Sequence, residues 1–255
     1  MRVVSTTCSN TEIVCALGCA DYLVGVDEHS DYPPEVVQRL PRVGPDLGID
    51  PEAVAALQPD LVIASLTVPG HDKVVASLRE RGLPVIAPQP LSLSDVWRDI
   101  RDIAHALGVP ERGEALASAL SAQIPAPPRE PRGPRILVEW WPKPVIVPGA
   151  KSWVTDLIHA AGGVSVLGHE PVESRPLQPG EGAALQPDAV VIAWCGVPFD
   201  KYRIDVVTRR EDWQDTPALR HGRVVPIPEA WLGRPGPRLA EGYRALVKLV
   251  GECNG

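Results

Sequence analysis

The chain has 255 residues, of which 44% are apolar and 22% charged, an ordinary composition for a globular protein of one large domain or two smaller ones. Its net charge is −7 with no basic run, which argues against nucleic-acid binding, because that needs clustered Lys and Arg to neutralise phosphates. No apolar stretch approaches the ~20 residues of a membrane span, and the five cysteines contain no CxxC pair, which argues against a zinc ribbon or a disulfide framework.

The first predicted elements are a strand, a helix and a second strand. Residues 2–6, RVVST, predict the first strand. Ser9-Asn10-Thr11-Glu12 has the form of a capping box, in which Ser9 and Glu12 each accept the other's free backbone N–H, and a helix follows to Gly18. The second strand is the apolar run LVGV at 23–26.

One phrase occurs twice. Residues 56–64 read ALQPDLVIA and residues 184–193 read ALQPDAVVIA. Each copy predicts the end of a short helix, a turn at Pro-Asp and a buried parallel strand, because a continuous apolar run is typical of a strand covered on both faces. The first of these helices begins at Asp50-Pro51, where Asp caps and Pro takes the first helical position.

The second half repeats the order of the first. Residues 135–139, RILVE, predict a strand, and Ser152 begins a helix that ends at Gly162-Gly163. Gly180 to Leu185 then forms the short helix before the second copy of the repeated phrase. Because both the order and the spacing recur, we predict an internal duplication.

Two helices and a proline-rich stretch separate the halves. The helices are predicted at 92–107, which carries an apolar stripe, and at 111–124, and the stiff segment PAPPREPRGP follows at 125–134. We therefore predict an α/β fold with two lobes, each with a mostly parallel sheet flanked by helices, joined by a long linking helix. The predicted parts are an N-terminal lobe at 1–91, a linking segment at 92–134 and a C-terminal lobe at 135–255.

Ligands of parallel α/β sheets bind beyond the carboxyl ends of the strands, so candidate binding residues follow from the predicted strands. The first half places small polar side chains and one imidazole there: Cys8, Ser9, His29, Ser30, Tyr32 and Ser65. The second half places tryptophans, a carboxylate and a guanidinium there: Trp140, Trp141, Trp194, Glu229, Trp231 and Arg234. Opposed across a cleft, the two sets would suit a large ligand that is partly flat and partly polar.

Several candidates also have a purely structural interpretation. Trp140 and Trp141 are consecutive, so on a strand end they point to opposite faces and at most one faces a ligand. Trp153 falls in a helical pattern and is expected in the core. His29 is either a metal ligand through its imidazole nitrogen or a hydrogen-bonding residue of a loop.

The sequence shows no catalytic motif. Cys8 and Cys195 are expected to be buried thiols, because no neighbouring His motif or basic residue would activate them. GxSxG, GxxxxGK[ST] and HExxH are all absent. We therefore expect a protein that is not an enzyme.

Three stretches of the first half resemble the cobalamin-binding proteins of ABC importers: TTCSNTEIVCALG (6–18), LVGVDEHSDYPPEV (23–36) and LPRVGPDLGIDPEAVAALQPDLVIAS (40–65). The W…RPGPR element at 231–238 falls in the family's order. These are helical-backbone (class III) substrate-binding proteins, a class that also carries siderophores and haem. The resemblance implies a monomer, without a catalytic cofactor, that captures a corrinoid such as cobalamin between its lobes and delivers it to the permease of an ABC importer.

The resemblance also implies roles for single residues. Glu52 matches a glutamate with which such proteins dock on arginines of the permease, and Glu181 matches a second one displaced by one place. The alternative for both is a Glu favoured at a helix start by the helix dipole. His29 stands where the family commonly has an aromatic residue, and it is either a cobalt ligand or a replacement for a stacking contact.

The resemblance and the chain start predict different locations. The resemblance implies an extracytoplasmic protein, in the periplasm or cell envelope. A native start at Met1, with no signal peptide visible, implies a cytoplasmic one.

Two alternatives to a corrinoid importer remain at this point. One is the same fold carrying an iron-siderophore or haem, with Arg175, Arg234 and Tyr32 meeting anionic oxygens. The other is a cytosolic corrinoid-handling protein or enzyme that uses His29, Cys8 and Glu229.

Overall fold

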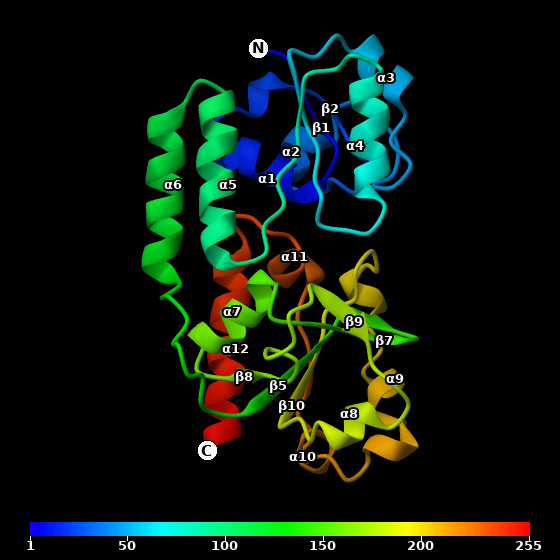
Figure 1. The fold of residues 1–255 in the computed structure, drawn as a ribbon, viewed down its shortest axis with the longest axis vertical. Helices are drawn as coiled ribbons and strands as arrows, with labels where there is room; N and C mark the ends of the chain where they lie inside the picture. Colours follow the sequence, from blue (N-terminus) through cyan, green and yellow to red (C-terminus); the bar gives the residue numbers. More distant parts are fainter. The chain divides into compact units, whose positions relative to one another are not determined.

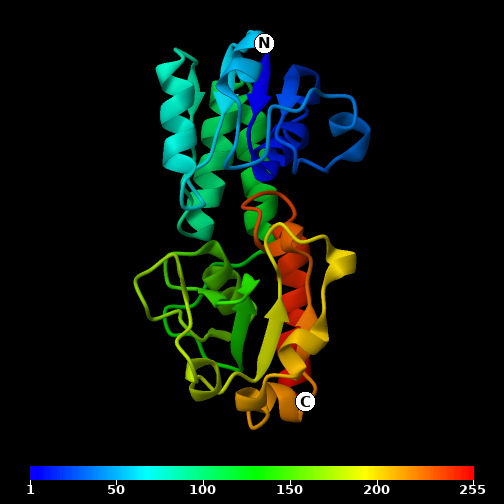
Figure 2. The same cartoon turned by 90° about the vertical axis from the view of Figure 1, so that its right-hand side faces the viewer.

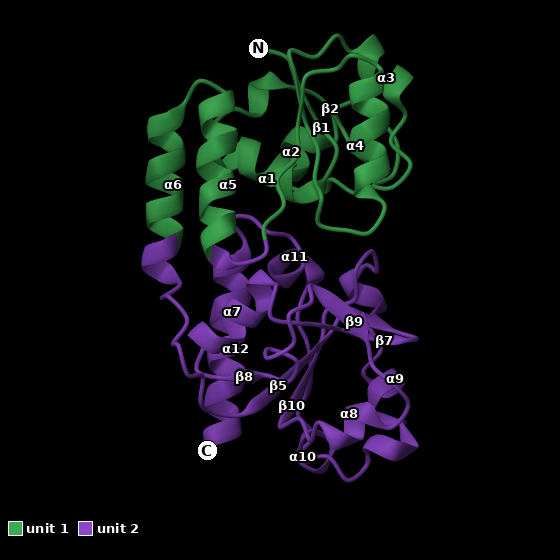
Figure 3. Cartoon of the chain, in the orientation of Figure 1, with its two compact units in different colours: residues 1–90, 94–120 green, residues 91–93, 121–255 purple.

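The computed structural model describes residues 1–255, and the chain divides into two compact units (Figure 3). Unit 1 comprises residues 1–90 and 94–120, and unit 2 comprises residues 91–93 and 121–255. The short segment 91–93 belongs to unit 2, where the Leu93 N–H donates to Asp156 Oδ2 at 2.8 Å.

A four-stranded parallel sheet in the order β2-β1-β3-β4 forms the centre of unit 1, with helices on both sides (Figure 1). The two long helices predicted between the halves belong largely to this unit. In chain order the elements are β1 (Val3–Ser5), α1 (Cys8–Ala16), η1 (Ala20–Tyr22), β2 (Leu23–Val26), α2 (Pro34–Val37), α3 (Pro51–Ala56), β3 (Leu61–Ile63), α4 (His71–Glu80), β4 (Val85–Ile86), α5 (Leu93–Ala106) and α6 (Pro110–Gln123).

Unit 2 has a four-stranded parallel sheet in the order β11-β10-β5-β8 and a small antiparallel sheet, β6-β7-β9. In chain order the strands are β5 (Arg135–Glu139), β6 (Trp141–Pro142), β7 (Val145–Pro148), β8 (Val164–Ser165), β9 (Ser174–Pro176), β10 (Ala189–Ile192) and β11 (Val224–Pro226). The helices are α7 (Trp153–Ala160), α8 (Glu181–Ala184), η2 (Phe199–Lys201), α9 (Ile204–Thr208), η3 (Glu211–Trp213), α10 (Pro217–Arg220), α11 (Glu229–Leu232) and α12 (Leu239–Asn254).

The two parallel sheets share one topology. Read from the matching edge, β2-β1-β3-β4 of unit 1 corresponds to β8-β5-β10-β11 of unit 2. In each sheet the first strand of the unit pairs in parallel with the strand of the repeated phrase, β1 with β3 and β5 with β10. The predicted fold class, two α/β lobes with parallel sheets flanked by helices, is confirmed.

The repeated phrase forms the same hydrogen-bonded junction in both units. In unit 1 the Asp60 carboxylate accepts the backbone N–H of Arg2 at 2.7 Å, and Arg2 Nε donates to Leu57 O at 3.0 Å. In unit 2 Asp188 accepts the N–H of Arg135 at 2.7 Å, and Arg135 Nε donates to Leu185 O at 2.8 Å. Each junction therefore fixes the start of a central strand to the turn before its neighbour.

A backbone turn of the same form precedes each of these junctions. Gln58 and Gln186 are the two non-glycine residues with positive φ, at 48° and 44°. This left-handed conformation lets the chain leave the short helix and enter the strand after a connection of four residues.

Local caps agree with the sequence in two places and differ in one. Asp50 caps α3 and Ser152 caps α7, as predicted. The capping box at Ser9 is wrong, because α1 already begins at Cys8 and Ser9 lies within the helix. Thr7 is the extended residue before the helix, and its Oγ1 accepts from the Asn10 side chain at 2.9 Å.

Each unit has a hydrophobic core of its own. In unit 1, Val4, Val54, Val62 and Leu78 are fully buried in one cluster with their neighbours. The core of unit 2 includes these buried side chains from several elements: Leu137, Val147, Leu167, Val190, Ile192, Trp194, Val207 and Trp213.

Candidate functional site

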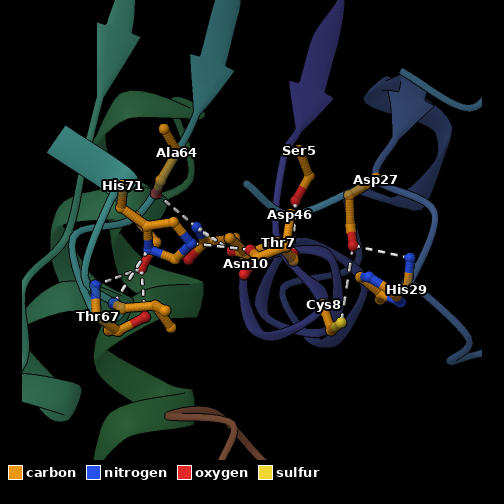
Figure 4. A network of polar contacts seen from close by, with 12 residues as sticks. Ser5, Thr7, Cys8, Asn10, Asp27, His29, Asp46, Ala64, Thr67 and His71 are labelled. Atoms are coloured by element: carbon orange, nitrogen blue, oxygen red, sulfur yellow. Dashed lines mark hydrogen bonds and ion pairs between the residues drawn. The ribbon is translucent and has the colours of Figure 1, made fainter. Parts of the chain in front are cut away.

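The carboxyl edge of the unit 1 sheet is built from hydrogen-bonded polar side chains (Figure 4). Asn10 Nδ2 donates to Thr7 Oγ1 at 2.9 Å and to Ala64 O at 2.7 Å, which joins α1 to the end of β3. Thr11 Oγ1 lies 2.8 Å from Ser30 Oγ, which joins α1 to the turn after β2. These side chains are all buried, so the network holds the three strand ends in one arrangement.

Asp27 organises the turn after β2. Its carboxylate, fully buried, accepts the Ser30 hydroxyl, the backbone N–H of His29 at 2.9 Å and the Cys8 thiol at 3.9 Å (Figure 4). Burial raises the pKa of the Asp27 carboxyl, and the hydrogen bonds from Ser30 and His29 act in the opposite direction. The buried Asp27 carboxylate therefore fixes the conformation of the turn that carries His29.

The structure divides the unit 1 candidates by exposure. Ser9, Ser30 and Ser65 are buried, and Cys8 is half-buried with its thiol toward Asp27. The two candidates whose rings are exposed are His29 and Tyr32. Of the set predicted in unit 1, these two side chains are therefore the ones open to solvent.

A second histidine, which the sequence analysis did not select, ties two loops of unit 1 together. His71 is 3% exposed, its Nδ1 accepts the N–H of Val68 at 3.2 Å, and its Nε2 lies 2.9 Å from Asp46 Oδ1. A neutral ring with its proton on Nε2 satisfies both contacts. The loop after β3 is thereby fixed to the loop that precedes α3.

A buried ion pair lies at the carboxyl end of the unit 2 sheet. Glu139, the last residue of β5, is fully buried and accepts from Arg210 at 2.6 and 3.0 Å and from Trp194 Nε1 at 2.9 Å. The Arg210 guanidinium lies 4.6 Å above the Trp213 ring. Sequence analysis missed this pair because its partners are 71 residues apart, and the only signal was an acidic residue ending an apolar strand.

The tryptophans of unit 2 occupy three different environments. Trp153 lies in the core, as predicted, with Nε1 donating to Leu232 O at 2.7 Å. Trp194 was predicted to contact the ligand, but it is only 4% exposed and packs in the core. Its ring therefore has no open face for a ligand. Trp140 and Trp231 are half-buried, and Trp141 is 41% exposed.

The charged candidates of unit 2 are engaged within the chain. Arg234 Nε donates to Glu229 Oε2 at 3.2 Å, and both side chains are largely buried. Arg175 lies between Glu170 and Glu181 and bonds both carboxylates. Both guanidinium groups are therefore already paired with carboxylates of the same chain.

The two glutamates proposed for docking differ in their surroundings. Glu52, in the first turn of α3, has a side chain 71% exposed and accepts from Arg81 at 2.7 and 3.0 Å. The Glu181 side chain is 22% exposed and accepts from Arg175 and from the Gln178 N–H. Hydrogen bonds from Arg175 lower the pKa of the Glu181 carboxyl to about 2.

Comparison with known proteins decides the family. The sequence profile of the periplasmic binding protein family matches residues 3–230. The chain belongs to this family. The binding protein is 27% identical to an uncharacterized ABC transporter substrate-binding lipoprotein, YvrC, of Bacillus subtilis, over 98% of this chain and 79% of the relative. It is also 27% identical to the vitamin B12-binding protein of Vibrio parahaemolyticus, over 93% of this chain and 84% of the relative.

Solved structures support the same assignment. The apo form of the periplasmic heme-binding protein RhuT from Roseiflexus has a TM-score of 0.82 and 31% identity, covering 100% of this chain and 99% of that one. The periplasmic vitamin B12-binding protein BtuF of Vibrio cholerae has a TM-score of 0.78 and 24% identity, covering 99% and 97%. At this identity the likeness to BtuF shows the fold alone.

The family assignment carries a general function. Members bind substrates for ABC importers, are not enzymes and act outside the cytoplasm, and the role implies a transporter permease as partner. None of the helices in this binding protein combines the length and the apolar character that a membrane span requires.

Proposed function

We propose that this binding protein captures a tetrapyrrole, with cobalamin as the first candidate. The observation that carries the proposal is the kind of side chain left open at the strand ends. Unit 1 presents an imidazole and a phenol, and unit 2 presents indoles: His29, Tyr32, Trp140, Trp141 and Trp231. The candidate arginines of unit 2 are already paired with glutamates. Aromatic faces with few open charges suit a flat macrocycle with an apolar surface.

Cobalamin is the first candidate because of the sequence relatives. Several proteins named vitamin B12-binding proteins match more than nine-tenths of this chain, the first of them at 27% identity. The peripheral amides of a corrin are suited to the exposed hydroxyl of Tyr32 at the unit 1 edge.

Haem is the second candidate, and His29 favours it. The exposed imidazole stands on a turn that Asp27 fixes through the backbone, and a neutral imidazole nitrogen is a good ligand for haem iron. The 31% identity to RhuT over the whole chain supports the same ligand class.

An iron-siderophore is less well supported. Anionic chelates are commonly met by arginines that are open to the ligand. In this chain Arg175 is bonded to two glutamates and Arg234 to Glu229.

We also propose that the protein works outside the cytoplasm and docks on its permease through α3. Glu52 is the stronger docking candidate, since its carboxylate is largely exposed and its ion pair with Arg81 is a surface pair of low strength. Glu181 would first have to leave Arg175.

The experiment is a ligand titration by calorimetry and absorption spectroscopy. Cyanocobalamin, hemin and a ferric catecholate are each added to the purified protein. We expect cyanocobalamin or hemin to bind with a Kd of about 1 μM or tighter, and the catecholate to bind at least tenfold more weakly, where tenfold is about 1.4 kcal/mol. Absence of binding to both tetrapyrroles at micromolar protein contradicts the proposal.

A His29→Ala variant separates the two ligand candidates. Cyanocobalamin carries both axial ligands on its cobalt, so its binding should change little. A haem held through His29 should lose its ligand, which shifts the Soret band and weakens binding. An unchanged hemin spectrum contradicts ligation by His29, and Tyr32→Phe is the matched control at the neighbouring exposed ring.

A further inference from the structure

The segment that follows β10 carries the only phenylalanine of the chain, Phe199, and exposes half of it. Phe199 opens the short helix η2 beyond the carboxyl end of β10, the strand that leads into this segment (yellow in Figure 2). Single exposed apolar residues are common on protein surfaces and by themselves indicate nothing. Phe199 differs because its ring is held by a series of other aromatic rings.

Three rings lead from the core of unit 2 to its surface. Trp194, almost fully buried, lies 5.5 Å from Tyr202 between ring centroids, at an interplanar angle of 49°. Tyr202 lies 5.3 Å from Phe199 in an edge-to-face contact. Aromatic pairs at these distances attract beyond the area that they bury. The exposed ring is therefore anchored to the core.

Tyr202 is itself tied to two strand ends. Its hydroxyl donates to Trp194 O at 3.0 Å and accepts the N–H of Glu229 at 3.2 Å, so it joins the segment after β10 to the start of α11 after β11. Burial raises the pKa of the Tyr202 phenol above its ordinary value, which keeps this donor protonated. At the buried end of this series of rings, the Trp194 indole N–H donates to Glu139, which also accepts from Arg210.

The surroundings of Phe199 fit a small ligand better than a protein partner. Asp200 and Lys201 follow it directly, and their side chains are 74% and 71% exposed. An exposed aromatic flanked by charges is not the broad apolar patch that marks a protein interface. A ring fixed in advance also loses little conformational freedom when a flat ligand packs on it.

We propose that Phe199 is a ligand-contacting residue that packs against the tetrapyrrole and helps to select it. The inference rests on the proposed function. The sequence analysis assigned the ligand contact to Trp194, which is buried. We assign it to Phe199, whose ring packs on Tyr202, which in turn packs on Trp194. Ligands of parallel sheets lie beyond the carboxyl ends of the strands, where this segment is fixed.

The test compares three variants of the full chain. Phe199→Ala removes the exposed ring, and Ile204→Ala is the matched control, because Ile204 is 42% exposed in the same unit and belongs to no ring contact. Tyr202→Phe keeps both ring contacts and removes the hydroxyl tether. Each protein is titrated with cyanocobalamin and with hemin, and its thermal unfolding is recorded.

We expect Phe199→Ala to weaken the binding of whichever tetrapyrrole the wild type binds by about tenfold, that is about 1.4 kcal/mol. Its unfolding temperature should fall by no more than about 4 °C, because half of the ring is exposed and a single edge-to-face contact is lost. Ile204→Ala should bind within about twofold of the wild type, and Tyr202→Phe should fall between the two.

The outcomes separate the inference from the function on which it rests. If the wild type binds a tetrapyrrole and Phe199→Ala binds it equally well, Phe199 makes no contact and the inference is wrong while the function stands. The inference is also wrong if Ile204→Ala loses as much affinity as Phe199→Ala. If the wild type binds neither ligand, the proposed function fails and the inference fails with it.

Discussion

Asp99, on α5, is a buried carboxylate whose Oδ2 has no hydrogen-bond partner. Burial is the main cause that raises the pKa of Asp99 from 3.8 to about 6, and the hydrogen bond from Arg98 only partly offsets it. Between these two pH values the folded chain binds more protons than the unfolded chain. Its stability therefore falls as the pH rises from about 4 to about 6, and above that range the buried charge is a constant cost.

Asp99→Asn should remove this cost. At pH 7 we expect the variant to be more stable than the wild type by about 3 kcal/mol, and the difference should disappear near pH 4, where the wild-type carboxyl is protonated. The measurement is urea unfolding at a series of pH values. Asp102→Asn, an exposed acid on the same helix, is the control and should show no such pH dependence. A wild-type advantage for Asp99 at pH 7 would mean that its pair with Arg98 outweighs the burial.

At the scale of elements, the repeated Asp-Arg junction offers a matched pair of variants. Asp60 and Asp188 each accept the backbone N–H of the arginine that starts a central strand. The Asp60 junction is exposed and the Asp188 junction is partly buried. Because a buried donor left without its acceptor costs more than one that water reaches, the two truncations should differ.

We expect Asp188→Ala to lower the free energy of unfolding by about 1 to 3 kcal/mol and Asp60→Ala by about 1 kcal/mol or less. Chemical denaturation of the two variants side by side gives the comparison. Gln58→Ala and Gln186→Ala serve as controls, since they change the neighbouring exposed residues and leave the carboxylates in place. Equal losses at both junctions would show that burial does not set their strength.

The sequence predicted elements whose signals are local. Asp50-Pro51 and Ser152 are caps that act on the next few residues, and the repeated phrase carries its turn and its strand together. The box at Ser9 was placed wrongly because the helix begins at Cys8, with Thr7 as the residue before it, so Ser9 already lies inside the helix.

The candidate site was harder to predict, because it depends on burial and on distant partners. Of the side chains chosen at the strand ends, the serines and Trp194 are buried. The exposed Phe199 was not chosen, because it lies in a short segment without a strand or helix pattern. Glu139 and Arg210 meet only when β5 and the segment after α9 are both in place. Periodicity indicates which strands are buried, but not which residues beyond their ends remain open.

At the scale of the whole molecule, the two units carry separate cores and very different numbers of spectroscopic probes. The chain has seven tryptophans, and all except Trp97 lie in unit 2. Intrinsic fluorescence therefore reports mainly on unit 2. Far-UV circular dichroism also reports on unit 1, which holds most of the two long helices α5 and α6.

Glu139→Ala tests whether the two units unfold separately, because it leaves the largely buried charge of Arg210 without its carboxylate partner. Loss of one member of a buried pair costs about 3 kcal/mol or more, and both members belong to unit 2. We expect the fluorescence transition in urea to move to lower concentration, while part of the helical signal unfolds where the wild type does. Glu139→Gln, which still accepts from Trp194, should be less affected. If both probes shift together in the alanine variant, the units unfold as one body and their separate cores do not confer separate stability.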